Sequence, residues 1–217
     1  MEYHDNIGVP YDDPFDEEND CPLDEENDCP LDEENEITRG ITIMRKVIRA
    51  RDKGTTFEVG WNEHGQPIDP NASMFVSYIG AVVREHIPIT LDCWRPKDKS
   101  IIGPAKDFIW SEIQRSFIVD DTHKKYVLQE AGKLHRGFRT MLTTKHLKDA
   151  DGNFKDRPNL YKGLISPDEW KTFVAKRKSE AFKAISDLNR KRAEKAPYPY
   201  KRARRGYALL EQDIVSI

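Results

Sequence analysis

Apolar residues recur at intervals of three and four along much of the chain, which is the spacing of amphipathic helices. The first such stretch contains Phe75, Ile79, Val82 and Val83; Asn71 can cap its start, and Pro88 ends it at about His86. The second stretch contains Phe108, Ile109, Ile113 and Phe117, with Trp110 at its edge. Each of the two stretches predicts a helix with one buried face.

The longest regular pattern lies further along, where apolar residues are spaced by four, three, four and three positions: Val127, Ala131, Leu134, Phe138 and Met141. As one helix, this segment carries Lys125, Arg136 and Arg139 on the face opposite the apolar stripe. Gly132 and Gly137 each cost a helix about 1 kcal/mol relative to alanine. They can therefore divide the segment into two helices.

The sequence SPDEW, residues 166–170, begins a further helix. Ser166 caps its start, Pro167 occupies the first turn, where no backbone N–H is needed, and Glu169 completes a capping box. This start signal predicts a helix with one apolar face that stops at Leu188. The face consists of Trp170, Val174, Ala181, Ile185 and Leu188.

A short strand is predicted before the first helix, because apolar and smaller or polar residues alternate over residues 57–61. Asn62, Gly65 and Pro67 supply the turn that follows it. The fold class predicted by these elements is mainly α: a helical bundle with a minor β-strand or hairpin.

The net charge of -3 conceals an acidic segment attached to a basic one. Residues 1–36 contain 16 Asp and Glu and no Lys or Arg, whereas residues 37–217 carry a net charge of +13. We expect a disordered acidic segment at residues 1–36, a mainly helical domain at residues 37–195 and a basic tail at residues 196–217. Such asymmetry is typical of proteins that bind polyanions, although a merely soluble basic domain would also show it.

The acidic segment contains an octapeptide unit written twice and begun a third time, DEENDCPLDEENDCPLDEEN, at residues 16–35. We call these residues the acidic repeat. Leu23 and Leu31 are its only sizeable apolar groups, so it buries too little surface to fold by itself. Cys21 and Cys29 lack the short spacing of zinc ligands. A local DNA duplication is the simpler interpretation, and a decoy that competes for the basic body is the alternative.

No motif in the chain supports catalysis. The glycine-rich phosphate-binding motifs do not occur, and no serine or cysteine lies in a nucleophile elbow. Asp120 and Asp121 are more typical of a helix cap than of a metal site. His64, His86 and Cys93 are interpreted as exposed imidazoles and a buried thiol rather than as zinc ligands. We therefore expect no enzyme activity, no catalytic residue, no metal and no cofactor.

The chain also lacks the features of membrane and secreted proteins. No apolar run reaches the roughly 18 residues of a membrane span. The acidic N-terminus has no hydrophobic core of a secretory signal. Three cysteines spread far apart do not make a disulfide framework, which favours a reducing, intracellular compartment.

Basic residues gather where they suit DNA binding and nuclear import. Cations near phosphates release counterions, so binding is strong at low salt. The DNA-binding candidates are Lys125, Lys133, Arg136, Arg139, Lys145 and Lys148. The import candidates form two clusters eight residues apart: Arg190, Lys191 and Arg192, then Lys201, Arg202, Arg204 and Arg205. This spacing is that of a bipartite import signal, although a solvated helix face and a basic arm would give the same patterns.

Several blocks between residues 39 and 208 resemble the plant transposon-associated protein family of the Ptta/En/Spm type, labelled as plant transposases. The blocks are RGITIMRKV, FEVGWNEHGQPIDPNASMFVSYIGAVVREHIPITLDCW, IWSEIQRSF, GKLHRGFRTML, SPDEWKTFVAKRKSEAFKAISDLNRKR and RRGYA. His135 departs from the pattern, in which a tryptophan is expected. The resemblance implies Myb-like or trihelix-like central helices and no catalytic residue. It also implies four core anchors: Trp61, Trp94, Trp110 and Trp170.

Charge and resemblance together imply a non-catalytic DNA-binding protein of the nucleus, derived from a plant transposable element. It would bind element ends or act as a domesticated regulator, with DNA and a nuclear import receptor as partners. One alternative is a protein-interaction adaptor whose tryptophan-rich helices dock a protein partner while the basic arm serves only for import. The other is an inactive transposon remnant.

Overall fold

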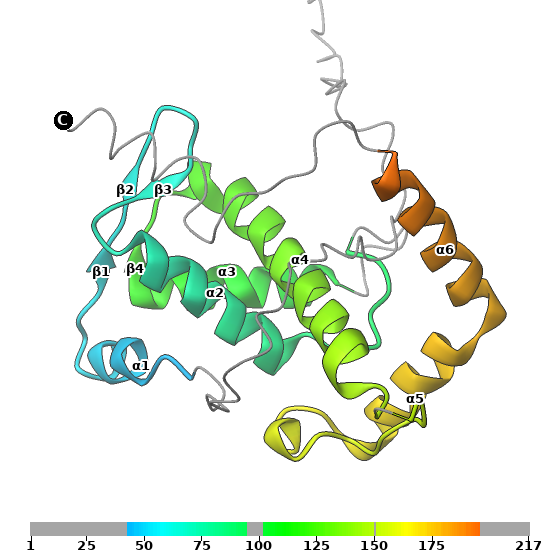
Figure 1. Cartoon of the computed structure of the whole chain (residues 1–217). Coiled ribbons are helices and arrows are strands. Elements are labelled where there is room, and N and C mark those ends of the chain that lie inside the picture. Colours follow the sequence, from blue (N-terminus) through cyan, green and yellow to red (C-terminus); the bar gives the residue numbers. More distant parts are fainter. Residues whose placement is uncertain (1–42, 95–101, 150, 196–217) are drawn as a thin grey trace, which may run out of the picture.

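The computed structural model describes residues 43–94, 102–149 and 151–195 (Figure 1). The expected acidic segment and basic tail lie outside these residues. The mainly helical class expected from the sequence is confirmed. The α-helices are α1 (Arg45–Asp52), α2 (Ala72–His86), α3 (Gly103–Ser116), α4 (Lys124–Met141), α5 (Pro167–Lys178) and α6 (Glu180–Glu194), with shorter helical turns at Asp121–His123, Leu142–His146 and Asn159–Tyr161.

Two small sheets accompany the helices. Their strands are β1 (Phe57–Glu58), β2 (Gly60–Trp61), β3 (Pro67–Ile68) and β4 (Phe117–Ile118). β2 and β3 pair antiparallel as the expected hairpin, and β1 pairs in parallel with β4. In the hairpin turn, the Asn62 side chain accepts hydrogen bonds from the backbone N–H groups of His64, at 3.1 Å, and Gln66, at 2.9 Å. Gly65 has a φ of 67°, a conformation that glycine adopts without steric cost.

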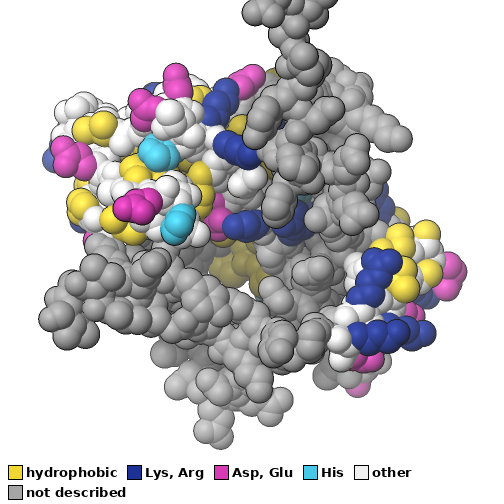
Figure 2. All heavy atoms as spheres, turned by 90° about the horizontal axis from the view of Figure 1, so that it is seen from above, with side chains coloured by type: hydrophobic (Ala, Val, Ile, Leu, Met, Phe, Trp, Pro, Cys, Tyr) yellow, Lys and Arg dark blue, Asp and Glu magenta, His cyan; other side chains and the backbone are white. Residues whose placement is uncertain are grey.

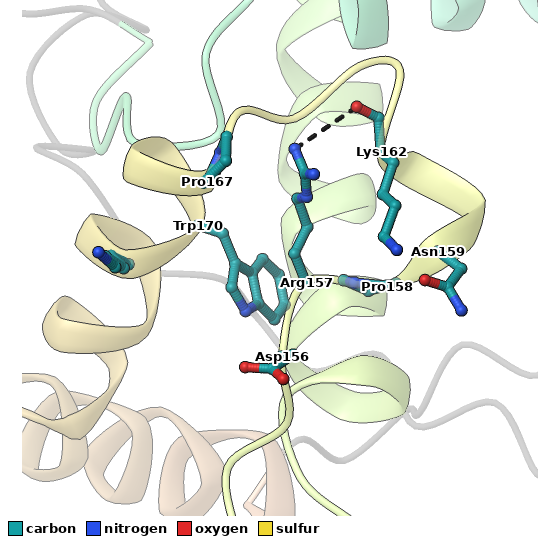
Figure 3. Close-up of a pocket in the computed structure, with 8 residues that line it drawn as sticks. Asp156, Arg157, Pro158, Asn159, Lys162, Pro167 and Trp170 are labelled. Atoms are coloured by element: carbon teal, nitrogen blue, oxygen red, sulfur yellow. Dashed lines mark hydrogen bonds between the residues drawn. The ribbon is translucent and has the colours of Figure 1, made fainter.

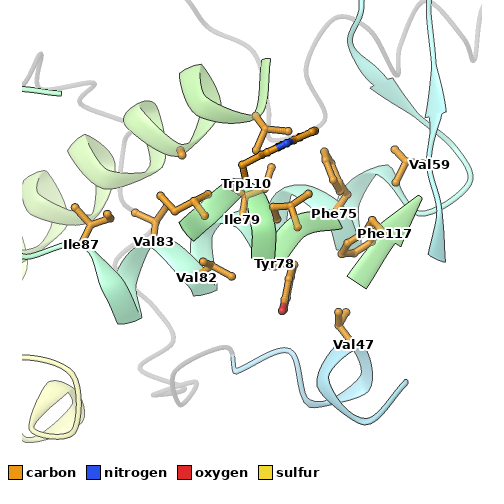
Figure 4. Packing of buried hydrophobic residues seen from close by; sticks show 14 residues of the cluster. Val47, Val59, Phe75, Tyr78, Ile79, Val82, Val83, Ile87, Trp110 and Phe117 are labelled. Carbon is orange, nitrogen blue, oxygen red and sulfur yellow. The ribbon is translucent and has the colours of Figure 1, made fainter. Parts of the chain in front are cut away.

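The first hydrophobic core is formed by α1, α2, α3 and the first half of α4 (Figure 4). The apolar positions predicted for α2 are buried, and α2 ends at His86, as expected from Pro88. In α3 the buried face is centred on Ile109 and Ile113, and it includes Trp110. Phe108 was wrongly placed in the buried stripe: it lies beside this face, 40% exposed, with its ring 4.5 Å from that of His86.

A second hydrophobic core lies beside the first. It is built mainly from residues that come later in the sequence than those of the first core. Its buried members are Ile89, Phe138, Leu142, Leu147, Tyr161, Ile165, Trp170 and Phe173. α4 contributes to both cores, since Val127 and Ala131 belong to the first and Phe138 to the second. The position of α4 thus fixes how the two cores are arranged.

α4 is one continuous helix, and its two glycines do not divide it. A Cβ atom on Gly132 would lie 2.9 Å from the indole of Trp94, so this glycine makes room for the tryptophan. A Cβ atom on Gly137 would meet nothing within 4 Å. Packing against the two cores outweighs the low helix propensity of both residues.

Ser166 and Asn71 both precede the helices that they were expected to cap, but only Ser166 makes the expected hydrogen bond. The Ser166 hydroxyl accepts a hydrogen bond from the backbone N–H of Glu169 at 3.1 Å, as expected. The Glu169 carboxylate does not complete a capping box, because it accepts instead from the backbone N–H of Ile89 at 2.6 Å. Asn71 precedes α2, but its side-chain amide donates to the backbone oxygen of Glu58 at 3.0 Å rather than capping the helix.

The apolar face predicted from Trp170 to Leu188 is interrupted. The chain is extended at Ser179, where α5 ends, and the Ser179 hydroxyl accepts from the backbone N–H of Phe182 at the start of α6. Trp170 is buried, but Ile185 is 36% exposed and Leu188 is 47% exposed. The prediction that these two residues share a buried face with Trp170 was therefore wrong.

Candidate nucleic-acid interface

Positive charge is concentrated in the second half of the described chain. Residues 124–195 contain 19 Lys and Arg against 9 Asp and Glu, whereas residues 43–123 contain 11 of each kind. In Figure 2, Lys and Arg side chains gather over α6, at the right of the view. The basic excess therefore belongs to α4, α5, α6 and the segments between them.

One face of α4 brings three of the DNA-binding candidates together. Lys125, Lys133 and Arg136 are all exposed, and their spacing of eight and three residues places them along the same side of the helix. The Lys133 amine forms an ion pair with Glu130 at 3.1 Å. Exposed pairs of this kind contribute little and exchange readily for other partners. This side of α4 presents cations that phosphates can reach.

Arg139 does not belong to this face, so its prediction as an exposed DNA-binding residue was wrong. Its side chain is only 3% exposed, and its guanidinium forms an ion pair with the Asp92 carboxylate at 3.0 Å. The second oxygen of Asp92 pairs with the Lys176 amine of α5 at 2.6 Å. The loop after α2 folds back over α4 here, which covers a position that helical periodicity alone placed in solvent.

Lys145 and Lys148 follow α4 and are both exposed. Lys145 lies in the π-helical turn at the end of α4, while the Lys148 amine lies 5.2 Å from the ring centroid of Phe154. Between them, burial of the His146 imidazole lowers its pKa, and the charges of Lys155 and Lys145 lower it further. Burial and these two cations together thus disfavour a proton on His146.

The first import cluster lies on α6. Arg190, Lys191 and Arg192 are exposed, and Arg190 forms only a long ion pair with Asp187, at 3.6 Å. The second cluster, at Lys201, Arg202, Arg204 and Arg205, lies outside the described residues. The first cluster of the expected import signal is thus on the surface, where a receptor can reach it.

An open pocket of about 630 Å³ lies between the start of α5 and the preceding loop (Figure 3). Its lining includes Lys162, Lys171 and Asp156, and Trp170 forms part of its wall. The Arg157 guanidinium is engaged by the backbone oxygens of Lys162 and Ile165. The pocket therefore adds two cations to the basic surface.

The four tryptophans occupy two kinds of position. Trp110 and Trp170 are buried, one in each core. Trp61 and Trp94 are partly buried at the border of the first core, and Trp61 stacks on His123 with ring centroids 3.6 Å apart. Trp110 and Trp170 thus lie in the cores as expected, whereas Trp61 and Trp94 pack at the border of the first core.

Two further residues were not anticipated. Asp92 joins α4 to α5, yet a single aspartate in a loop carries no sequence signal for this role. Cys93 forms a disulfide bond, so the expected buried thiol at this position was wrong. The other two cysteines of the chain, Cys21 and Cys29, lie outside the described residues.

The described residues contain neither a group of possible metal ligands nor a helix that could span a membrane. Among the residues that the structure describes, no three His, Cys, Asp or Glu side chains are grouped as a metal ion would require. None of the described helices is both long enough and apolar enough to cross a bilayer.

No protein-family model, curated protein or solved structure matches the sequence or the fold.

Proposed function

We propose that this protein is a non-catalytic DNA-binding protein and that the exposed face of α4 provides its main contacts. The observation that carries the proposal is the set of exposed cations Lys125, Lys133 and Arg136 on one side of a continuous helix. Lys125 and Arg136 are eleven residues apart, which spans about 16 Å of helix. That length covers about five base pairs of duplex.

The exposed Lys145 and Lys148 extend this surface beyond the end of α4, and the basic residues of α6 add charge nearby in the sequence. Contacts from such side chains go mainly to phosphates, which position a protein on the duplex without reading its sequence. The proposal is therefore one of salt-dependent binding. It includes nuclear localisation through the two basic clusters and an origin in a plant transposable element, for which the quoted sequence blocks are the support.

A gel-shift experiment tests the proposal on the full chain. We expect a labelled duplex to be retarded at 50 mM salt and released at 200 mM, as counterion release requires. Changing Lys125, Lys133 and Arg136 together to glutamate should weaken binding at least tenfold. The matched control changes Arg45, Lys46 and Arg49 of α1, which are also exposed, to glutamate and alters the net charge equally. Equal losses in the two triple variants would show that α4 is not the interface.

A protein-interaction adaptor is the second candidate function, and the exposed apolar residues of α6 favour it. Ile185 and Leu188 are partly exposed on a helix whose main neighbour is α5. In an adaptor the basic residues would serve import alone. Partner capture that survives nuclease treatment and does not change in the α4 triple variant would favour this function over DNA binding.

A further inference from the structure

The solvent-facing side of α6 combines an apolar stripe with a high density of cations. Ala181, Ala184, Ile185 and Leu188 follow one another at spacings of three, one and three residues and are all exposed. The adjacent side of the helix carries Phe182, whose ring centroid lies 4.2 Å from the guanidinium of Arg177. α6 is thus attached through one side and presents an apolar stripe on another.

The charge around this stripe selects an acidic occupant. Residues 171–195 contain nine Lys and Arg and three Asp and Glu, and Lys191 and Lys195 follow the stripe on α6. Two of the α6 cations form exposed ion pairs: Lys183 pairs with Glu180 at 2.8 Å and Arg190 with Asp187 at 3.6 Å. An acidic chain can replace such partners at little cost, because exposed pairs contribute about 0–1 kcal/mol each.

We propose that the acidic repeat of the same chain, residues 16–35, docks on this face of α6. The repeat has eleven Asp and Glu and no Lys or Arg, and its two sizeable apolar residues are Leu23 and Leu31. Its composition therefore matches the face of α6 in both respects: carboxylates for the cations and a leucine for the exposed Ile185 and Leu188. The decoy interpretation of the repeat gains a specific docking surface.

Attachment to the same chain also makes weak docking effective. A segment joined by a flexible linker has an effective concentration in the millimolar range, so an interaction too weak to detect between separate molecules is occupied within one. The docked repeat would compete with polyanions for the basic surface and would dissociate as salt is raised. The docking of the acidic repeat does not require that the competing polyanion be DNA.

Zero-length crosslinking of the full chain tests the docking directly. A carbodiimide joins carboxylates to lysine amines that touch, and residues 1–39 form one tryptic peptide because Arg39 is the first basic residue. After reduction of disulfides, we expect this peptide to be joined to Lys191 or Lys195, at the end of α6, at least fivefold more often than to Lys46 of α1 or to Lys53, which follows α1. Equal yields on α1 and α6, or loss of the crosslinks on reduction, would overturn the proposal.

Matched variants separate the apolar contact from charge attraction alone. Ile185→Ser with Leu188→Ser, and separately Leu23→Ser with Leu31→Ser, should each lower the α6 crosslinks about threefold. The second pair leaves the described body unaltered, so a folding defect cannot explain its effect. Ile118→Ser is the control, because Ile118 is 58% exposed on β4, away from α6. No difference from this control, or crosslinks found only in dimers, would contradict docking within one chain.

Discussion

The guanidinium of Arg139 and the carboxylate of Asp92 form an ion pair of 3.0 Å that joins α4 to the loop after α2. Arg139 is almost fully buried, whereas Asp92 is half exposed and also pairs with Lys176. The Nε atom of Arg139 is buried and has no hydrogen-bond partner among the residues that the structure describes. This arrangement makes Arg139 a structural residue, whereas Arg136, three residues earlier, faces solvent.

The first prediction concerns stability. Arg139→Ala should lower the free energy of unfolding by roughly 2 kcal/mol, because it removes a buried side chain and one of the two cations that hold Asp92. Arg136→Ala should change it by less than about 0.5 kcal/mol, as is usual for exposed sites. Urea unfolding followed by circular dichroism measures both. A loss for Arg136→Ala as large as that for Arg139→Ala would contradict the assignment of the two arginines.

The second prediction uses the same pair to test the DNA interface. Arg136→Ala should lower the slope of log affinity against log salt by about 1, because one phosphate contact is lost. Arg139→Ala, measured well below its unfolding temperature, should leave the slope unchanged because its guanidinium does not reach the surface. Titration of a labelled duplex by fluorescence anisotropy at four salt concentrations gives both slopes. A reduced slope for Arg139→Ala alone would place the interface elsewhere.

The third prediction compares the two glycines of α4. Gly132→Ala should destabilise the protein by about 1 kcal/mol or more, because the new methyl group would lie 2.9 Å from the Trp94 indole. Gly137→Ala should stabilise it by roughly 0.5–1 kcal/mol, because the site is open and alanine is the better helix former. Thermal unfolding of the two variants decides the matter. Stabilisation by Gly132→Ala would mean that Trp94 does not pack against α4.

These residues show what the sequence can and cannot establish. The stripe from Val127 to Met141 predicted helix over this segment, because periodicity is a local property of the chain, but it left open whether the segment forms one helix or two. The burial of Arg139 was not predictable, since it depends on a loop 47 residues away in the sequence folding over the helix. The hydrogen bond of Glu169 was not predictable for the same reason: its carboxylate accepts from the backbone N–H of Ile89, 80 residues away in the sequence, instead of completing a capping box.

The candidate site was predicted in outline only. Basic residues at helical spacing predicted an exposed face on α4, and Lys125, Lys133 and Arg136 do share it. Ile185 and Leu188 continue the apolar pattern of α5, but the extended backbone at Ser179 redirects α6. The pattern could not show this break, because a serine before a glutamate is an ordinary helix start as well as an ordinary helix residue. Whether Myb-like geometry applies to the central helices stays a prediction.

The last prediction concerns pH. Burial, and secondarily the charges of Lys155 and Lys145, lower the pKa of His146 in the folded protein. The unfolded chain therefore binds a proton at this site more readily, and stability falls as the pH drops below the ordinary histidine pKa of about 6.5. We expect the melting temperature to fall more between pH 7.5 and pH 5.5 in the natural protein than in His146→Gln. The difference should be small, because the imidazole is only partly buried. Replacing Lys155 by Gln should raise the pKa of His146, which NMR titration of the imidazole measures directly. An unchanged pKa in that variant, together with equal pH dependence of His146→Gln and the natural protein, would refute this electrostatic account of the residues that follow α4.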